Sequence, residues 1–203
     1  DGVQVNKFES NKIHVRGVVF SELAQNYSHG LAQKSLYVWL KEQNVPFITN
    51  VDTRTLTKHL RSHGTVIGAI GNKPKSKFIE HNIVSVSEPI VYNKTNKKTV
   101  IVVDCGAKNN IIESLKKFSV CVKVVPYNYD FTKEKYNGVL ITNGPGDPTN
   151  YKETITNVKR ALNINKPMFG ICLGNQIMAL AAGAKTYKLP FGHRGHNQPC
   201  IYD

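Results

Sequence analysis

The chain has 203 residues, of which 40% are hydrophobic and 20% charged, an ordinary composition for a globular protein. No apolar run approaches the ~18 residues of a membrane span, so we expect no membrane partner. The formal net charge of +13 is compatible with nucleic-acid binding. The lysines are scattered, however, and no basic run alternates with aromatic residues as single-strand binders require. We therefore expect no nucleic-acid partner.

The four cysteines are scattered along the chain, at Cys105, Cys121, Cys172 and Cys200. They form no C-x-x-C pair and have no regular spacing, which argues against a zinc site or a disulfide framework. This usage suits a reducing compartment, and we expect a cytoplasmic protein. The seven histidines show no metal-ligand pattern either, so the prediction for metal sites is none.

The first part of the chain mixes short predicted strands and helices. Residues 13–20 are predicted to form a strand. Apolar residues spaced three and four apart predict a helix over residues 30–43, ending near Pro46. Residues 65–70 are predicted to form another strand.

Between those last two elements, Asp52 is a plausible N-cap for a helix that runs through Arg61, and Gly64 lies just past its end. The polar, lysine-rich residues 71–98 follow. We predict a small mixed α/β N-terminal domain over residues 1–98, with a linker from about residue 71, and a second domain over residues 99–203.

From Thr99 onward, apolar runs typical of strands alternate with amphipathic segments typical of helices. The predicted strands are residues 100–103, 120–125, 138–142 and 168–171, and the predicted helices are residues 107–118, 151–162 and 174–182. This order favours an α/β fold, an open and mostly parallel sheet with flanking helices.

Cys172 is the candidate nucleophile, because it lies between a predicted strand and a predicted helix. A nucleophile on such a sharp turn is held out of the sheet, beside the positive end of the helix dipole, which favours a thiolate. Gly170 and Gly174 supply the small residues that a tight turn needs. The alternative is a buried cysteine acting as a small hydrophobe, which we expect for Cys105, Cys121 and Cys200.

A second loop, Asn143-Gly144-Pro145-Gly146-Asp147-Pro148, follows the third predicted strand. Its prolines and glycines restrict the backbone, and a rigid loop that presents N–H groups suits an oxyanion hole. The alternative is a plain turn. Ligand sites of open α/β sheets lie at the carboxyl ends of the strands. We therefore expect this loop to meet residues 104–106 and 172–174 at one rim.

These motifs resemble a known family. GPGDP at residues 144–148 and GICLGNQ at residues 170–176 resemble a class I, triad-type glutamine amidotransferase. Further segments resemble the small subunit of glutamine-dependent carbamoyl phosphate synthetase: residues 104–111, 181–186 and 191–199 in its amidotransferase domain, and DTRTLT at residues 52–57 and RSHG at residues 61–64 in its N-terminal domain.

The resemblance implies a role for each matching residue. Cys172 would attack the side-chain carboxamide of glutamine, release ammonia and leave a glutamyl thioester that water hydrolyses. The N–H groups of Leu173 and Gly146 would hold the oxyanion. Gly144, Gly146, Leu173 and Gln176 would line the glutamine site.

The resemblance also implies a partner. Ammonia would pass to a synthetase large subunit or a fused synthetase domain, which makes carbamoyl phosphate from bicarbonate and ATP in pyrimidine or arginine biosynthesis. ATP and magnesium are expected in that partner. No cofactor is expected in this chain, which has no G-x-x-x-x-G-K-[ST] loop.

The family's catalytic His and Glu would lie beyond the position of Asp203. The amidotransferase domain is thus expected to be C-terminally incomplete and the chain to be an internal fragment. Without general acid–base help, typically worth ~10²–10⁴-fold in rate, the fragment alone would be a poor glutaminase.

Two other interpretations stay open at this point. The first is another class I amidotransferase, against which the match at Asp52 to Gly64 weighs. The second is a docking or regulatory domain without glutaminase activity, against which the presence of Cys172 and Gln176 weighs.

Overall fold

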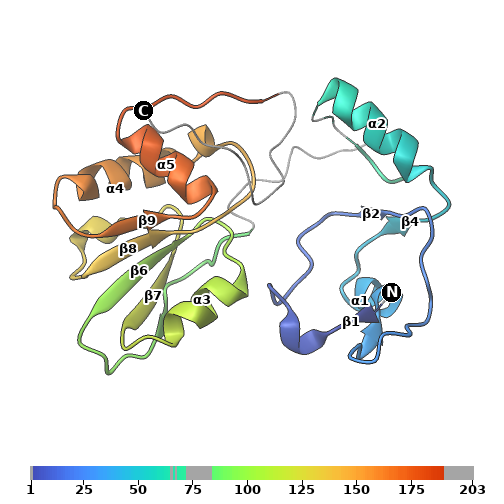
Figure 1. The fold of residues 1–203 in the computed structure, drawn as a ribbon, viewed down its shortest axis with the longest axis horizontal. Coiled ribbons are helices and arrows are strands. Elements are labelled where there is room, and N and C mark those ends of the chain that lie inside the picture. The colour runs from blue at the N-terminus through green and yellow to red at the C-terminus, as the bar shows by residue number, and fades with distance from the viewer. Residues whose placement is uncertain (1, 65, 67, 72–83, 190–203) are drawn as a thin grey trace. The chain divides into compact units, whose positions relative to one another are not determined.

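The computed structural model describes residues 2–64, 66, 68–71 and 84–189. By its internal contacts the chain separates into two compact units (Figure 1). The first unit comprises residues 1–5, 15–76 and 187–203, and the second comprises residues 6–14 and 77–186.

The first unit is built from very short elements. They are β1 (Gly2–Val3), η1 (Val5–Lys7, which continues into the second unit), β2 (Val18–Val19), β3 (Lys34–Ser35), α1 (Leu36–Glu42), β4 (Phe47–Ile48) and α2 (Thr53–His63). Strand β1 pairs with β3 in antiparallel orientation, and β2 pairs with β4 in parallel. Of its described residues, only Ser35, Leu40 and Val45 are buried, so the core of this unit is thin.

Helix α2 begins where the sequence predicts. The Asp52 carboxylate accepts a hydrogen bond from the Thr55 N–H at 2.9 Å, which satisfies one of the free donors at the helix start. The helix ends at His63, two residues later than predicted, with Gly64 as its C-cap at φ +73°. The predicted capping at both ends is thus confirmed.

Three other predictions for this unit need correction. Residues 13–20 contain only the two-residue strand β2, because its partner β4 is equally short and the ladder ends there. Helix α1 begins at Leu36 rather than at residue 30, because residues 34 and 35 pair with β1 and the Ser35 hydroxyl then caps the helix. Of residues 65–70, the described ones are not in a strand, and residues 65 and 67 lie outside the described part.

The second unit contains a five-stranded sheet. Its elements are β5 (Ile90–Tyr92), β6 (Thr99–Asp104), α3 (Asn109–Lys116), β7 (Cys121–Pro126), η3 (Phe131–Lys133), β8 (Gly138–Ile141), η4 (Pro148–Asn150), α4 (Lys152–Leu162), β9 (Met168–Gly170) and α5 (Leu173–Ala181). The strand order is β5-β7-β6-β8-β9. All neighbours are parallel except the pair of β5 and β7. The predicted α/β fold with a mostly parallel sheet is confirmed.

Sequence reasoning missed β5, which lies in the segment predicted as a linker. The strand has three residues and is only partly buried, so it lacks the continuous apolar run of the central strands. Its pairing with β7 is antiparallel, from Ile90 opposite Val124 to Tyr92 opposite Val122. At least this part of residues 71–98 therefore belongs to the sheet.

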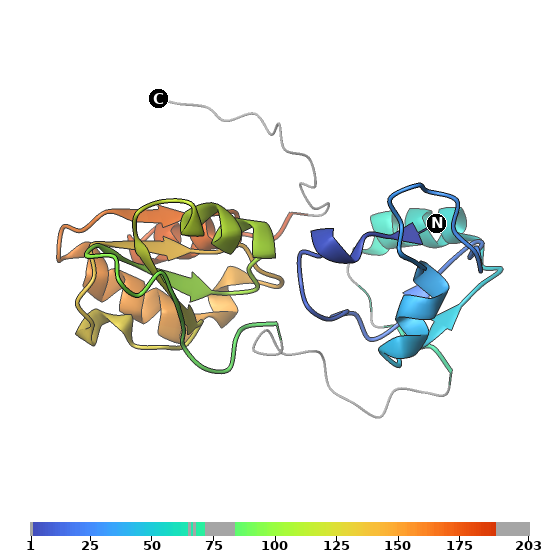
Figure 2. The ribbon, with the colours of Figure 1, turned by 90° about the horizontal axis from the view of Figure 1, so that it is seen from below.

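Helices cover both faces of the sheet (Figures 1 and 2). On one face, Ile101 and Val103 of β6 pack in a cluster with Val158 of α4 and Ile177 of α5. On the other face, Val102 packs in a cluster that includes Ile111, Ile112 and Leu115 of α3. Strand β6 is thus buried on both sides, as its unbroken apolar run predicts. Within the described part of the chain, no helix combines the length and apolar character needed to cross a membrane.

Candidate active site

Cys172 occupies the turn between β9 and α5. Its side chain is exposed, and it is the N-cap residue of the nine-residue helix α5. Its backbone has φ +53° and ψ −107°, a conformation that costs a non-glycine residue ~1–3 kcal/mol and that recurs at functional sites. The predicted strand–turn–helix arrangement around this residue is confirmed.

Close backbone packing explains the glycines beside Cys172. A Cβ atom on Gly174 would lie 2.2 Å from the Ile141 carbonyl oxygen, and one on Gly170 would lie 2.5 Å from the Asn175 nitrogen. The Ile171 N–H donates to the same Ile141 carbonyl at 3.0 Å. The turn is therefore pressed against the carboxyl end of β8. A side chain at Gly174 would force it away from β8, and one at Gly170 would overlap the first turn of α5.

Gly144 is the point where three loops meet. A Cβ atom on this residue would lie 2.1 Å from the Cys105 carbonyl oxygen and 2.8 Å from Leu173 Cδ2. Cys105 follows β6, Gly144 follows β8 and Leu173 follows the cysteine turn. The predicted convergence of these loops at one rim of the sheet is confirmed.

Asp104 organises the loop that follows β6. This residue is 4% exposed, and its carboxylate accepts N–H donors from Gly106 at 2.9 Å, Ala107 at 2.7 Å and Val86 at 2.7 Å. Three backbone donors satisfy a buried carboxylate without any cation. Sequence reasoning placed Asp104 at the rim but assigned it no role. An aspartate directly before Cys-Gly at a strand end is the signal that could have shown it.

The loop after β8 is held by side chains that the sequence did not single out. The buried Thr142 hydroxyl accepts the Cys105 N–H at 3.0 Å and donates to the Asn143 carbonyl at 2.9 Å. The Asn143 amide donates to the Gly106 carbonyl at 3.1 Å. The Tyr151 hydroxyl lies within hydrogen-bond distance of two carbonyls, those of Pro145 and Cys105. Side chains thus tie this loop to the end of β6.

Two backbone N–H groups at this rim have no hydrogen-bond acceptor among the described residues and could therefore bind a ligand. The Leu173 N–H and the Gly146 N–H donate no hydrogen bond to any described residue. The Leu173 side chain is buried, whereas Gly146 is exposed and has φ +89°. Unpaired donors beside a nucleophile are what an oxyanion hole consists of.

The other predicted site residues lie close by. Gln176 is exposed on the first turn of α5, and its N–H donates to the Cys172 carbonyl at 3.2 Å.

The cysteines differ sharply in their surroundings. Cys105 and Cys121 are buried, as expected, and burial raises the pKa of the Cys105 thiol. Cys200 lies outside the described residues. Of the described cysteines, only Cys172 is both exposed and next to free N–H donors.

No described histidine hydrogen-bonds to Cys172. His14 contacts Ser10, and its pKa is lowered by partial burial and by Lys12, while His59 and His63 stack on α2. His81, His193 and His196 lie outside the described residues. Among the residues that the structure describes, no group of three His, Cys, Asp or Glu side chains could hold a metal ion.

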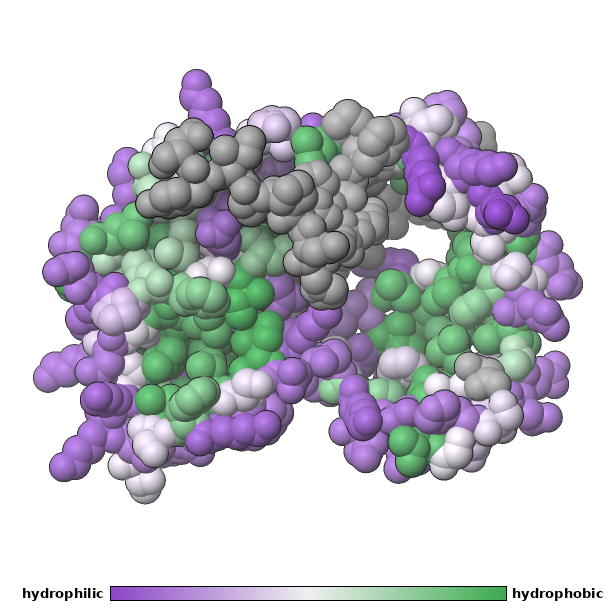
Figure 3. All heavy atoms as spheres, viewed as in Figure 1, coloured by the Kyte–Doolittle hydropathy of each residue, from purple (hydrophilic) through white to green (hydrophobic). Residues whose placement is uncertain are grey.

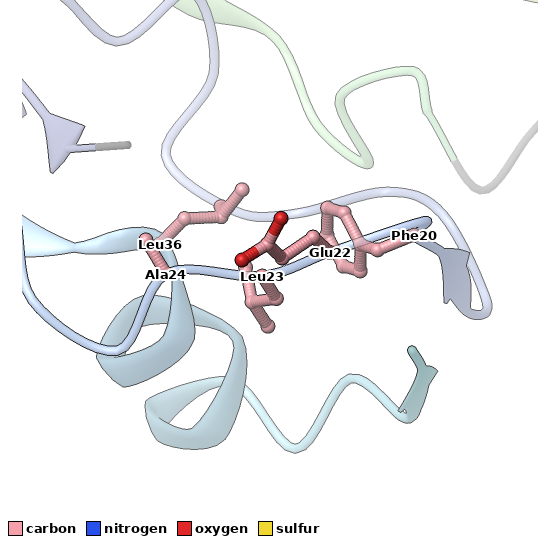
Figure 4. A pocket seen from close by; sticks show the side chains of 5 residues that line it. All are labelled: Phe20, Glu22, Leu23, Ala24 and Leu36. Carbon is pink, nitrogen blue, oxygen red and sulfur yellow. The ribbon is translucent and has the colours of Figure 1, made fainter. Parts of the chain in front are cut away.

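A cavity of about 340 Å³ lies in the first unit, away from these residues in the sequence. Figure 4 shows the Glu22 side chain there together with Phe20, Leu23, Ala24 and Leu36. The cavity contains no nucleophile and no cluster of polar groups, so it suggests no chemistry.

Part of the exposed positive charge lies on helix α2. Arg54, Lys58 and Arg61 are exposed and form no ion pair with any described residue. Figure 3 shows hydrophilic residues over this helix. Part of the net charge thus lies outside the unit that contains Cys172.

Comparison with known protein families agrees with this geometry. The model of class-I glutamine amidotransferases matches residues 101–203, which is about half of the chain, and the chain belongs to this family. The model of the CPSase domain of the carbamoyl-phosphate synthase small chain matches residues 1–70. The two matches together cover most of the chain, so a segment similar to the small-chain CPSase domain precedes the class-I glutamine amidotransferase domain.

Curated relatives resemble the chain over nearly its whole length. The multifunctional protein CAD of Squalus acanthias is 44% identical over 97% of this chain and 9% of that protein. The mitochondrial carbamoyl-phosphate synthase [ammonia] of Homo sapiens is 44% identical over 99% of this chain and 14% of that protein. The chain therefore spans only about a tenth of the length of these relatives.

Proposed function

We propose that this chain hydrolyses glutamine as part of a larger protein and supplies the ammonia to a synthetase unit for carbamoyl phosphate formation. The observation that carries the proposal is the exposed Cys172 at the N-terminus of α5, beside the loop that contains Gly144 and Gly146. The family matches over residues 1–70 and 101–203 support the choice of carbamoyl phosphate over other amidotransferase products.

In the proposed reaction the Cys172 thiolate attacks the side-chain carboxamide carbon of glutamine. The carbonyl π electrons move to the oxygen, which becomes the oxyanion. Collapse of this intermediate expels ammonia after protonation of its nitrogen and leaves a thioester. Water then attacks the thioester carbon, and cleavage of its C–S bond yields glutamate and the free thiolate. Nucleophilic catalysis thus replaces one difficult step by two easier ones.

The described residues would assist both steps. The N-terminus of α5 stabilises negative charge on sulfur. The free N–H groups of Leu173 and Gly146 would bind the oxyanion, and a single such donor is typically worth ~10²–10³-fold in rate. Gly144, Gly146, Leu173 and Gln176 would line the glutamine site. The absence of a side chain at Gly144 lets the loop approach Leu173 closely enough for this arrangement.

The resemblance implies that a histidine supported by a glutamate, elsewhere in the larger protein, would transfer the protons. ATP and magnesium would bind in the synthetase unit, either a large subunit or a fused domain, and the pathway would be pyrimidine or arginine biosynthesis. We propose a cytoplasmic location, and a domain division within residues 71–98, which is supported by the gap between the two family matches.

The test is Cys172→Ser in the intact protein. We expect glutamine-dependent carbamoyl phosphate synthesis to fall by more than about 10³-fold, because serine lacks an activated thiolate. Ammonia-dependent synthesis should stay within about twofold. A glutamine-analogue electrophile should label Cys172 in the parent protein and not in the variant. Retention of glutamine-dependent activity in the variant would show that the nucleophile assignment is wrong.

The second candidate function is docking or regulation without glutaminase activity. The name of the human relative, carbamoyl-phosphate synthase [ammonia], is the observation that favours it. The same measurement decides between the two functions. A parent protein that makes carbamoyl phosphate from ammonia but not from glutamine would support the second candidate and exclude the first.

A further inference from the structure

Tyr151 connects the candidate oxyanion loop to the core of the second unit. It is the N-cap residue of α4, and its side chain is fully buried. Its ring packs edge-to-face against Tyr127, with ring centroids 5.6 Å apart. The hydroxyl lies 3.0 Å from the Pro145 carbonyl oxygen and 3.2 Å from the Cys105 carbonyl oxygen. A phenol has one proton to donate, so these two carbonyls share it.

The contact with Pro145 matters because of the peptide to which that carbonyl belongs. The Pro145 C=O and the Gly146 N–H are the two ends of one planar peptide unit, and the described chain contains no cis peptide. In a trans peptide the C=O and the N–H point in opposite directions. A hydroxyl that holds the carbonyl toward the core therefore makes the Gly146 N–H point away from the core.

Without such a hold this peptide could rotate. Gly146 has φ +89°, and glycine adopts positive and negative φ with similar ease. Rotation of the peptide plane would carry the N–H away from its present direction. The Pro145 ring fixes only its own φ and does not restrain this peptide plane. Among described residues, Tyr151 is the only side chain whose hydrogen bond reaches the Pro145 carbonyl.

We propose that Tyr151 is a positioning residue for glutamine hydrolysis, which holds the Pro145–Gly146 peptide so that the Gly146 N–H is directed toward the forming oxyanion. This inference rests on the proposed function. Donation to the carbonyl also polarises the peptide and strengthens its N–H as a donor. The buried environment raises the pKa of Tyr151, so the hydroxyl keeps its proton throughout the physiological range.

The test compares two tyrosine-to-phenylalanine variants of the intact protein. Tyr151→Phe removes the hydroxyl and keeps the ring. The matched control is Tyr136→Phe in the same core cluster, where the hydroxyl is buried but has no hydrogen-bond partner among the described residues. We expect Tyr151→Phe to lower glutamine-dependent kcat by about 10- to 100-fold, part of the ~10²–10³-fold worth of one oxyanion donor. Tyr136→Phe should stay within about twofold.

A second readout separates positioning from a structural role. Alkylation of Cys172 by iodoacetamide is a displacement at carbon that forms no oxyanion, so its rate should be the same in Tyr151→Phe as in the parent protein. Ammonia-dependent synthesis should be unchanged as well. Parallel losses of alkylation, ammonia-dependent activity and glutamine-dependent activity would overturn the inference, because they would show a general structural defect.

The remaining outcomes are also decisive. A parent protein that uses glutamine, with Tyr151→Phe equally active, would overturn this inference and leave the proposed function intact. A parent protein that cannot use glutamine would overturn the proposed function and this inference with it. A selective loss of glutamine-dependent kcat in Tyr151→Phe supports both.

Discussion

The two units of this chain differ in what holds them together. In the second unit, strands of up to six residues form a sheet with an apolar cluster on each face. In the first, every strand has two residues, and only three of the described residues are buried. Two-stranded sheets of this kind are marginal in water by themselves. The candidate nucleophile therefore lies on the unit with the larger apolar core, and such packing can hold a strained turn in place.

Truncation of a core side chain is expected to give the largest contrast between the units. Ile177 on α5 is fully buried, whereas Leu56 on α2 is 37% exposed. We expect Ile177→Ala to lower the free energy of opening of the second unit by about 3 kcal/mol, since it leaves a cavity. Leu56→Ala should cost the first unit less than about 1 kcal/mol. Native-state hydrogen exchange on the intact protein, read for peptides of each unit, measures both values.

The opposite result would contradict this difference between the two units. If Leu56→Ala opened the first unit as strongly as Ile177→Ala opens the second, then Leu56 would have to be buried in the intact protein. The thin core of the first unit would then be completed by another part of that protein.

The two units also differ in how closely their backbone packs around a glycine. A Cβ on Gly174 would overlap the Ile141 carbonyl, whereas a Cβ on Gly30 in the first unit would meet no atom within 4 Å. We expect Gly174→Ala to destabilise the second unit by about 2 kcal/mol through overpacking, and to reduce glutamine-dependent activity by moving the cysteine turn. Gly30→Ala should change stability by less than about 0.5 kcal/mol. Equal effects in urea unfolding would show that the turn at Gly174 relaxes freely.

The smallest expected effect is the pH dependence of helix α2. Hydrogen bonds from the Thr55 N–H and hydroxyl lower the pKa of Asp52. Because the folded-state pKa lies below the unfolded value of about 3.9, the carboxylate stabilises the helix above that value, and the contribution disappears as the pH falls through the lowered pKa. The protection of the α2 amides, which is the ratio of the intrinsic to the observed exchange rate, should therefore fall on acidification. Asp52→Asn, which retains a capping acceptor, should remove this dependence.

The strands of the second unit were predicted well from the sequence and those of the first unit poorly, and the reason is physical. In the second unit the strands are buried on both faces, so their apolar runs are continuous and easy to recognise. In the first unit, residues 13–20 have apolar character but only two of them pair, because pairing depends on the length of a partner that is distant in the sequence. The capping of α2 was predictable although the core of the first unit is thin, because Asp52 and Thr55 act within one helical turn.

For the candidate site, residue types at short range were enough to predict Cys172 as the nucleophile, its flanking glycines and the loop from Asn143 to Pro148. The contacts of these segments follow only from the folded structure, in which β9 pairs with β8. Gly144 packs on Cys105 and Leu173, and Tyr151 reaches the Pro145 carbonyl. Those contacts depend on the order and register of parallel strands, which side-chain periodicity does not encode.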